Sequence, residues 1–210
     1  MSKIYLLSPT LQNGTIPLPM IEFETTADTL NLDGIDTLMF TSKEAVKRAD
    51  SIDKSWKEID TIAIGGATKK QIEELGGRVI YQPTEFYGEV LARDIIKLFA
   101  NRQILYLRPK KISFDSKGYL AKHSIELKEQ IIYETKCKSY GMSAKPAKNS
   151  IIIFTSPSTI ECFLRNFEWD SSYKAVVIGE ATKVHLPPNA TYFVASKPLI
   201  ASCVQKALEI

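Results

Sequence analysis

Two short motifs with hydroxyl-bearing side chains each occur twice in this 210-residue chain. The tripeptide Phe-Thr-Ser occupies Phe40–Ser42 and recurs 114 residues later at Phe154–Ser156. The run Gly-Gly-Ala-Thr-Lys at Gly65–Lys69 recurs at the same shift as Gly-Glu-Ala-Thr-Lys at Gly179–Lys183. Because chance seldom gives two motifs one common shift, the sequence indicates two related structural units.

The chemistry that these motifs favour is anion binding. Each motif follows a short apolar segment and opens a helical stretch, and a helix N-terminus offers unpaired N–H groups and the positive end of the helix dipole. Small hydroxyl side chains add further donors, namely Ser42, Thr68, Ser156 and Thr182. Helix capping alone would also explain the two serines. It explains the two threonines less well, because they lie beyond the cap position.

The sequence lacks the residues that several other kinds of chemistry require. The two histidines, His123 and His185, have no partner at metal-ligand spacing, so we expect neither a histidine-based metal site nor a catalytic triad. The chain has no Gly-x-x-x-x-Gly-Lys-Ser/Thr motif and no Gly-x-Gly-x-x-Gly motif after a strand. These gaps disfavour a nucleoside triphosphatase and a dinucleotide-binding enzyme.

Charge and hydropathy narrow the class of protein further. The net charge of +3 is too small for a dedicated duplex-DNA binder. Between Asn101 and Ser150, eleven Lys and Arg residues stand against four Asp and Glu residues. This surplus suits an anionic small ligand, and a solvated basic face explains it equally well. No apolar run approaches the roughly 18 residues of a membrane span, and the start lacks a signal-peptide cleavage site.

The cysteines are Cys137, Cys162 and Cys203, which are few, odd in number and far apart. Their spacing fits neither a zinc site nor a paired redox motif. We therefore expect reduced thiols and a cytoplasmic protein.

Strands and helices are expected to alternate along the chain, which predicts parallel sheets with helices on both faces. Strands are predicted at 3–7, 20–25, 37–40, 61–64, 79–81, 104–107, 125–135, 151–154, 175–178 and 192–194. Helices are predicted at 42–49, 67–75, 87–99, 157–165, 180–185 and 199–208, and a polar linker at 139–149. In such sheets ligands bind outside the carboxyl ends of the strands, where the repeated motifs fall.

The order and spacing of these and further motifs resemble the uroporphyrinogen-III synthase family over nearly the whole chain. The motifs are Phe40–Ser42 with Ala45-Val46, Ile64–Thr68, Glu74–Gly76, Glu89–Leu91, Leu107–Pro109, Ile132–Thr135, Phe154–Ser158 and Ile178–Thr182. The resemblance implies an α/β protein of two α/β domains with parallel sheets flanked by helices, joined by a two-stranded antiparallel ladder. One domain is then residues 1–20 plus 138–210, the other is 27–132, and the ladder is 21–26 with 133–137.

The resemblance also implies an enzyme, a lyase of porphyrin and heme biosynthesis. Its members cyclise hydroxymethylbilane to uroporphyrinogen III with loss of water and inversion of the last ring, and they need no cofactor and no metal. Tyr133 takes the catalytic position, although a tyrosine packed in the ladder is an equal alternative. The substrate-binding positions are Ser42, Thr68, Ser156, Ser158, Thr182, Arg108 and Lys110. Surface salt bridges would explain the last two equally well.

We further expect a monomer that binds neither nucleic acid nor membrane and receives its substrate from the preceding pathway enzyme. Two alternatives stay open. One is a non-catalytic two-lobed binding protein for a small polyanion. The other is a flavin-binding relative of flavodoxin.

Overall fold

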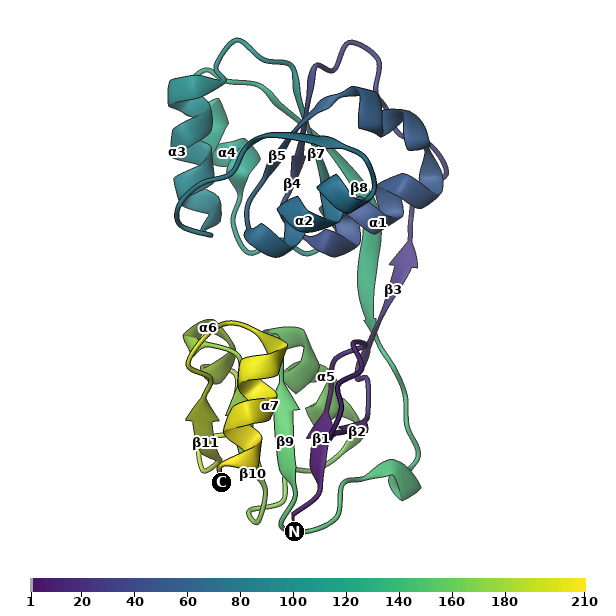
Figure 1. Ribbon diagram of the computed structural model, residues 1–210, viewed down its shortest axis with the longest axis vertical. Coiled ribbons are helices and arrows are strands. Elements are labelled where there is room, and N and C mark those ends of the chain that lie inside the picture. Colours follow the sequence, from purple (N-terminus) through teal and green to yellow (C-terminus); the bar gives the residue numbers. More distant parts are fainter. Residues whose placement is uncertain (1) are drawn as a thin grey trace. The chain divides into compact units, whose positions relative to one another are not determined.

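A computed structural model describes residues 2–210 and divides the chain into two units (Figure 1). Unit 1 comprises Met1–Glu22 and Thr135–Ile210, and unit 2 comprises Phe23–Glu134. The chain crosses from one unit to the other within strand β3 (Ile21–Thr25) and returns within strand β8 (Leu127–Cys137). Each unit is therefore described by itself below.

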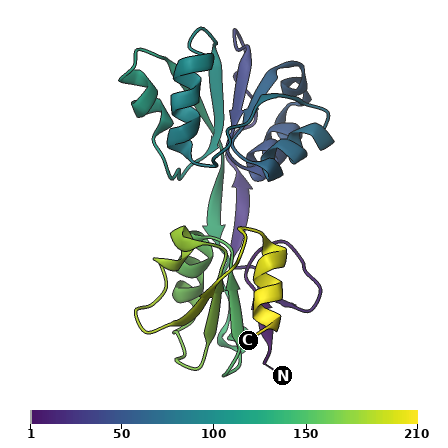
Figure 2. The ribbon, with the colours of Figure 1, turned by 60° about the vertical axis from the view of Figure 1, so that its left-hand side comes forward.

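Unit 2 is built on a six-stranded sheet in the order β3-β8-β7-β4-β5-β6. Its other strands are β4 (Thr37–Phe40), β5 (Asp60–Ala63), β6 (Arg78–Tyr81) and β7 (Ile104–Pro109). The neighbours β8, β7, β4, β5 and β6 pair in parallel, whereas β3 runs antiparallel beside β8 (Figure 2). The carboxyl ends of the parallel strands therefore meet at one edge of the sheet.

Unit 1 repeats this plan with a five-stranded parallel sheet in the order β11-β10-β9-β1-β2. Its strands are β1 (Ile4–Leu6), β2 (Ile16–Pro17), β9 (Ile151–Phe154), β10 (Lys174–Val177) and β11 (Thr191–Val194). Strand β9 leads into the second Phe-Thr-Ser motif and occupies the place that β4 has in unit 2. The two sheets thus place the repeated motifs at equivalent edges.

Helices connect the strands in both units. They are α1 (Lys43–Ile52), α2 (Gly66–Glu74), α3 (Gly88–Leu98), α4 (Ser116–Ala121), α5 (Pro157–Asn166), α6 (Glu180–Lys183) and α7 (Ile200–Leu208), with 3₁₀ turns at Lys54–Glu58 and Met142–Ala144. Helices α1 and α5 begin directly after Ser42 and Ser156, whose hydroxyls cap them. Capping therefore fixes where the chain turns from strand to helix behind each Phe-Thr-Ser motif.

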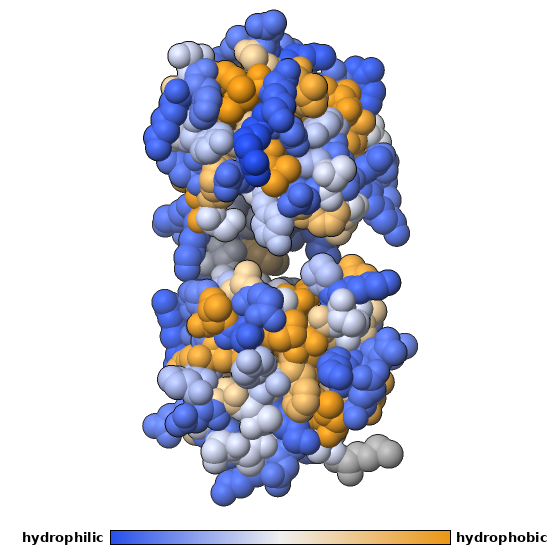
Figure 3. Space-filling view, turned by 90° about the vertical axis from the view of Figure 1, so that its left-hand side faces the viewer, coloured by the Kyte–Doolittle hydropathy of each residue, from blue (hydrophilic) through white to orange (hydrophobic). Residues whose placement is uncertain are grey.

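The hydrophobic core of unit 2 has two layers, one on each face of the sheet. Leu38 and Phe40 point into a cluster with α1 and Trp56, whereas Met39 points into a cluster with α3 and Leu120. This alternation follows from the period of two along a strand. Apolar side chains also remain on the surface of both units, as the face in Figure 3 shows, and scattered exposure of this kind is normal.

The predicted fold class is confirmed, and the strands at 37–40 and 151–154 have the predicted bounds. The sequence analysis missed the short strand β2, the helix α4 and the 3₁₀ turn Lys54–Glu58. Within residues 2–210, no helix has the length and apolar character that crossing a bilayer requires.

The expectation of three reduced thiols is wrong for two of them. Cys137 and Cys162 form a disulfide with their Cα atoms 5.2 Å apart, a separation that suits such a bond. Residue spacing could not reveal the pair, because the end of β8 and the helix α5 come together only in the folded unit 1. The third cysteine, Cys203, is free and buried.

Candidate active site

Two pairs of hydroxyl groups lie at the carboxyl-terminal edge of the unit 2 sheet. The Ser42 Oγ atom lies 2.9 Å from the Tyr133 hydroxyl oxygen, and the Thr41 Oγ1 atom lies 2.7 Å from the Tyr106 hydroxyl oxygen. Either oxygen can be the donor in both pairs. Two consecutive residues of one loop therefore bind the phenols of two different strands, β7 and β8.

The fold explains why these four groups meet. Strand β7 pairs with β4, with Tyr106 opposite Met39, and β8 pairs with β7, so both phenols lie near the end of β4. At that end the Ser42 Oγ atom accepts the Ala45 N–H at 3.1 Å and caps α1. Since this hydroxyl has accepted one bond, its own proton is available to a neighbour such as Tyr133.

Burial keeps both phenols neutral. Tyr133 is 4% exposed, and its ring meets the Phe23 ring edge to face at 5.8 Å between centroids. Burial raises the pKa of Tyr133 to about 12, although the hydrogen bond between Ser42 and Tyr133 acts in the opposite direction. Burial also raises the pKa of Tyr106. At neutral pH each phenol therefore retains its proton and can donate a hydrogen bond.

Glu44 and Arg48 form an ion pair in the first two turns of α1, near Tyr133. The Arg48 guanidinium contacts the Glu44 carboxylate at 2.6 Å and also donates to the Thr25 hydroxyl at 3.3 Å. Glu44 raises the pKa of Tyr133 and Arg48 lowers it, both less strongly than burial does. The charges near the phenol therefore oppose each other, and burial dominates its titration.

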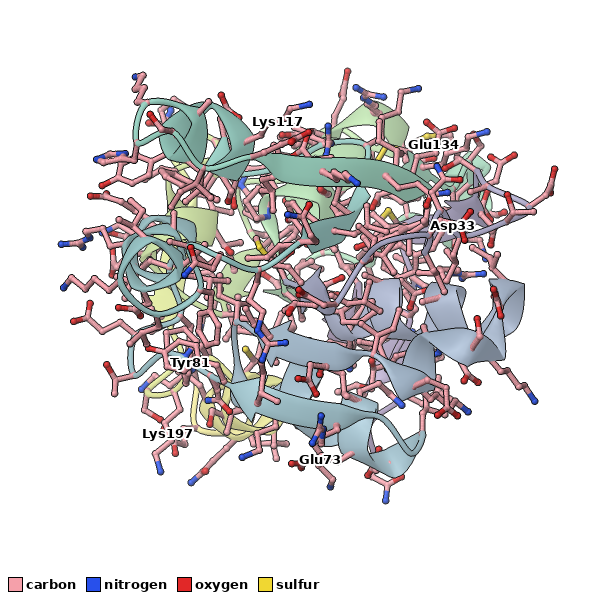
Figure 4. The ribbon with its side chains drawn as sticks, turned by 90° about the horizontal axis from the view of Figure 1, so that it is seen from above. Asp33, Glu73, Tyr81, Lys117, Glu134 and Lys197 are labelled. Atoms are coloured by element: carbon pink, nitrogen blue, oxygen red, sulfur yellow. A yellow bond between two sulfur atoms is a disulfide. The ribbon has the colours of Figure 1, made fainter. Side chains whose placement is uncertain are left out.

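The two basic candidates at the end of β7, Arg108 within the strand and Lys110 directly after it, differ in their contacts. The Arg108 guanidinium is ion-paired with Glu129 at 3.2 Å, and its Nη1 atom donates to the carbonyl oxygens of Pro109 at 3.0 Å and Lys110 at 3.3 Å. The side chain of Lys110 is 67% exposed and contacts Glu134, labelled in Figure 4, at 3.0 Å. Lys110 is thus accessible to a ligand, whereas Arg108 is held by the protein.

The remaining predicted site residues are divided between the units. Thr68 lies in the first turn of α2 in unit 2 and is 5% exposed, and Thr182 has the matching place in α6 of unit 1 at 3%. In unit 1, Ser156 caps α5 in a capping box with Thr159, and half-buried Ser158 lies in the same turn. Among the predicted residues, the structure joins the side chains of Ser42 and Tyr133, and the Lys110 N–H also donates to the Tyr133 carbonyl oxygen at 2.9 Å.

The sequence analysis missed Tyr106 as a functional candidate. The signal was present, because a tyrosine within the buried run Ile104–Leu107 needs a hydrogen-bond partner for its hydroxyl. Nothing in the sequence, however, identifies that partner as Thr41, which lies 65 residues earlier in the chain.

Comparison with known proteins gives this geometry a family context. The family model described as uroporphyrinogen-III synthase HemD matches residues 11–205. The chain is similar to the crystal structure of uroporphyrinogen-III synthetase from Helicobacter pylori 26695, with a TM-score of 0.85 and 27% identity over 100% of this chain and 99% of that one. A mutant uroporphyrinogen III synthase from the extremely thermophilic bacterium Thermus thermophilus shares the fold at a TM-score of 0.59, with 12% identity over 100% and 99%. No curated protein matches the sequence closely enough to be counted as a relative.

Proposed function

Because the chain belongs to the uroporphyrinogen-III synthase family, we propose that it cyclises hydroxymethylbilane to uroporphyrinogen III, with loss of water and inversion of the last pyrrole ring. The observation that carries this conclusion is the family match over residues 11–205. The Tyr133 phenol, whose oxygen lies 2.9 Å from the Ser42 Oγ atom, is the group that we assign to proton donation in this reaction.

In this reaction Tyr133 assists departure of the substrate hydroxyl. We propose that the Ser42 hydroxyl donates to the phenol oxygen, so that the phenol directs its own proton to the leaving oxygen. A pKa of about 12 keeps the phenol protonated throughout the neutral range. A positioned proton donor of this kind typically contributes about 10²–10⁴-fold. Loss of the hydroxyl leaves an electrophilic azafulvene, which the last ring attacks. Inversion then requires that the bond from this ring to its methylene bridge breaks and that the bridge re-forms at the other α-carbon of the ring.

The enzyme must also select the geometry of ring closure, because the free substrate closes without inversion. We propose that Thr68 in unit 2 and Ser156, Ser158 and Thr182 in unit 1 hold the acetate and propionate groups of the substrate. Lys110 is suited to exchange the Glu134 carboxylate for a substrate carboxylate because it is largely exposed. Positioning of this kind is worth up to about 7–11 kcal/mol in favourable cases, enough to redirect the closure.

Arg108 has a different place in the proposal. Its bonds to Glu129 and to the carbonyls of Pro109 and Lys110 support a role in holding the loop that carries Lys110. For Arg108 to bind a substrate carboxylate itself, the ion pair with Glu129 would have to open. We therefore propose that Arg108 contributes to substrate binding through the position of Lys110.

We also propose that the protein acts as a cytoplasmic monomer and receives its unstable substrate directly from the enzyme that makes it. A reducing compartment would keep Cys137 and Cys162 as thiols, so this proposal requires that activity does not depend on their disulfide. Light scattering of the purified protein tests the monomer, and equal activity with and without dithiothreitol tests the requirement.

One assay tests the proposed reaction directly. The protein is incubated with hydroxymethylbilane, the products are oxidised, and the porphyrin isomers are separated. We expect the type III isomer. A type I product equal to that of the protein-free control would overturn the proposal and would favour a non-catalytic binding protein for polyanions.

A further inference from the structure

The equivalent strands β7 and β1 differ in polarity at a buried position. Strand β7 lies beside β4 with Tyr106 opposite Met39, and β1 lies beside β9 with Leu6 opposite Ile153. Met39 and Ile153 are equivalent under the 114-residue shift, so Leu6 is the counterpart of Tyr106. Because Leu6 is buried at 1% exposure, an apolar side chain can fill this position of the shared fold. The fold therefore does not itself require the Tyr106 hydroxyl.

This hydroxyl is buried and has one specific partner. Tyr106 is 3% exposed, and its phenol oxygen lies 2.7 Å from the Thr41 hydroxyl. Thr41 is joined through one peptide bond to Ser42, whose hydroxyl contacts Tyr133. The contact between Tyr106 and Thr41 thus fixes the loop from which Ser42 reaches the proposed proton donor.

We propose that Tyr106 is a positioning residue for the synthase reaction, acting through Thr41 and Ser42 to hold the Tyr133 phenol in its productive orientation. This inference rests on the proposed role of Tyr133. Tyr106 itself need not touch the substrate.

The proposed effect is on turnover, because the orientation of a proton donor matters most where charge develops in the transition state. Without a contact to the core, the loop that carries Ser42 would be free to take several orientations. The hydrogen bond between Tyr106 and Thr41 restricts the loop to one of them, and because this bond is buried it is little disturbed by solvent. Removing it should leave the binding of substrate carboxylates, and therefore KM, almost unchanged.

The first test compares Tyr106→Phe with Tyr81→Phe. Both changes remove one phenol oxygen from unit 2, and the Tyr81 hydroxyl donates to Asp94 at 2.8 Å. We expect kcat to fall about five-fold in Tyr106→Phe with KM within about two-fold, as for loss of one hydrogen bond. Tyr81→Phe should retain wild-type kinetics. An unchanged kcat in Tyr106→Phe, or an equal loss in Tyr81→Phe, would overturn the inference.

Changes at Thr41 provide an independent test that does not alter the core. Thr41→Val removes the hydroxyl and keeps the shape, whereas Thr41→Ser keeps the hydroxyl. We expect Thr41→Val to reproduce the loss of kcat seen in Tyr106→Phe, and Thr41→Ser to restore most of it. Equal kinetics in the two Thr41 variants would overturn the inference, even if Tyr106→Phe failed to fold.

The double variant Tyr106→Phe/Tyr133→Phe separates the inference from the proposed function. If Tyr106 acts through Tyr133, the double variant turns over as slowly as Tyr133→Phe alone. A further loss of about five-fold in the double variant would overturn the inference and leave the role of Tyr133 standing. A wild-type kcat in Tyr133→Phe would instead overturn the proposed role of Tyr133 and this inference with it.

Discussion

The two units share a sheet order and a capped helix, but they use the cap serine differently. In unit 2 the Ser42 hydroxyl caps α1 and also contacts the phenol of Tyr133 at 2.9 Å. In unit 1 the Ser156 hydroxyl caps α5 and is part of a closed capping box with Thr159. The same motif is therefore connected to a candidate proton donor in one unit and to its own helix in the other.

The difference extends to the strands that face the motifs. Unit 2 has Tyr106 where unit 1 has Leu6, and the counterpart of β8 in unit 1 is the two-residue strand β2. Strand β2 ends at Pro17, opposite Leu6, whereas β8 continues beyond Glu129, opposite Tyr106, to Tyr133. We propose that both equivalent edges suit anions and that individual side chains make the unit 2 edge suited to proton transfer. We expect changes at the Tyr133 phenol and at Ser42 in unit 2 to affect kcat, and the matched changes in unit 1 to leave kcat unchanged.

The largest expected effect is that of Tyr133→Phe. Phenylalanine keeps the packing against Phe23 and loses only the hydroxyl, so kcat should fall about 100-fold or more while KM changes little. Steady-state assays of isomer formation measure both quantities.

Tyr173→Phe is the matched control in unit 1. The Tyr173 hydroxyl is buried and donates to the Pro146 carbonyl at 2.5 Å. Its loss should cost about 1 kcal/mol of stability and leave kcat unchanged. Equal losses of kcat in the two variants would contradict the division of roles between the units.

The next effect concerns the disulfide, which lies in unit 1 alone. Cys137 and Cys162 are 25 residues apart, and a disulfide that closes such a loop typically contributes about 3 kcal/mol. Reduction should therefore destabilise unit 1 and leave unit 2 unchanged. The two tryptophans report on the units separately, since Trp56 lies in unit 2 and Trp169 in unit 1.

Denaturation with and without dithiothreitol, followed in Trp56→Phe and Trp169→Phe, measures this difference. Cys203→Ser is the control, because it removes the buried free thiol without touching the disulfide. A reductant-induced shift of the Trp56 signal equal to that of Trp169 would show that the disulfide does not act within unit 1 alone.

Much of this comparison could be predicted from the sequence, because its main features are local. The caps at Ser42 and Ser156 follow from a serine between an apolar strand and a helical pattern, and the apolar runs at 37–40 and 151–154 mark the central strands. The shared shift predicted two related units. These signals depend on neighbours in the chain, which the sequence displays directly.

The contacts that distinguish the units could not be predicted in the same way. The pairs Thr41–Tyr106, Ser42–Tyr133 and Cys137–Cys162 join residues that are 65, 91 and 25 positions apart. Their partners are selected by strand order and register, which a single sequence does not specify. The Tyr133 position came from the family resemblance, and the Tyr106 position came only from the folded sheet.

A smaller effect is expected at alkaline pH. Burial raises the pKa of Tyr133 from 10.0 in the unfolded chain to about 12 in the folded protein. The neutral phenol therefore stabilises unit 2 fully below about pH 10, and this stability, about 2–3 kcal/mol at most, is lost as the pH rises to about 12. Denaturation at about pH 9, below this range, and at about pH 12, its upper end, followed by Trp56 fluorescence, measures the loss.

Tyr133→Phe should reduce the part of the alkaline loss that unit 2 shows. The Trp169 signal of unit 1 serves as the internal reference. Burial raises the pKa of Tyr140 and Tyr173 in unit 1, so this unit has an alkaline loss of its own, which Tyr133→Phe should leave unchanged. The same alkaline loss in Tyr133→Phe and wild type would mean that another group controls the titration of unit 2.

Thr68→Ala and Thr182→Ala test whether the units hold the substrate in the same way. Each change removes a hydroxyl at an equivalent place, so each should raise KM by about 5–30-fold, as for the loss of a hydrogen bond to a charged group, with little change in kcat. Thr191→Ala, at the exposed start of β11, is the control and should leave KM unchanged. A rise in KM for one variant only would assign carboxylate binding to a single unit.

The smallest effect is expected for the serine that occurs in both motifs. Its replacement compares the two units at the same position. Ser42→Ala and Ser156→Ala each remove a helix cap and should each cost about 1 kcal/mol of stability in their own unit. Only Ser42→Ala should also lower kcat, by about 3–10-fold, since only Ser42 contacts Tyr133. Kinetic assays and the two tryptophan signals measure these effects separately.

Ser42→Gly separates capping from catalysis at this position. Glycine is tolerated at a helix N-cap at a cost of only a few tenths of a kcal/mol, so most of the stability lost in Ser42→Ala should return. The hydroxyl that contacts Tyr133 stays absent, and kcat should therefore remain as low as in Ser42→Ala. If glycine restored kcat together with stability, Ser42 would act only as a helix cap, as Ser156 does. The chemical difference between the two units would then depend on Tyr133 and not on its contact with Ser42.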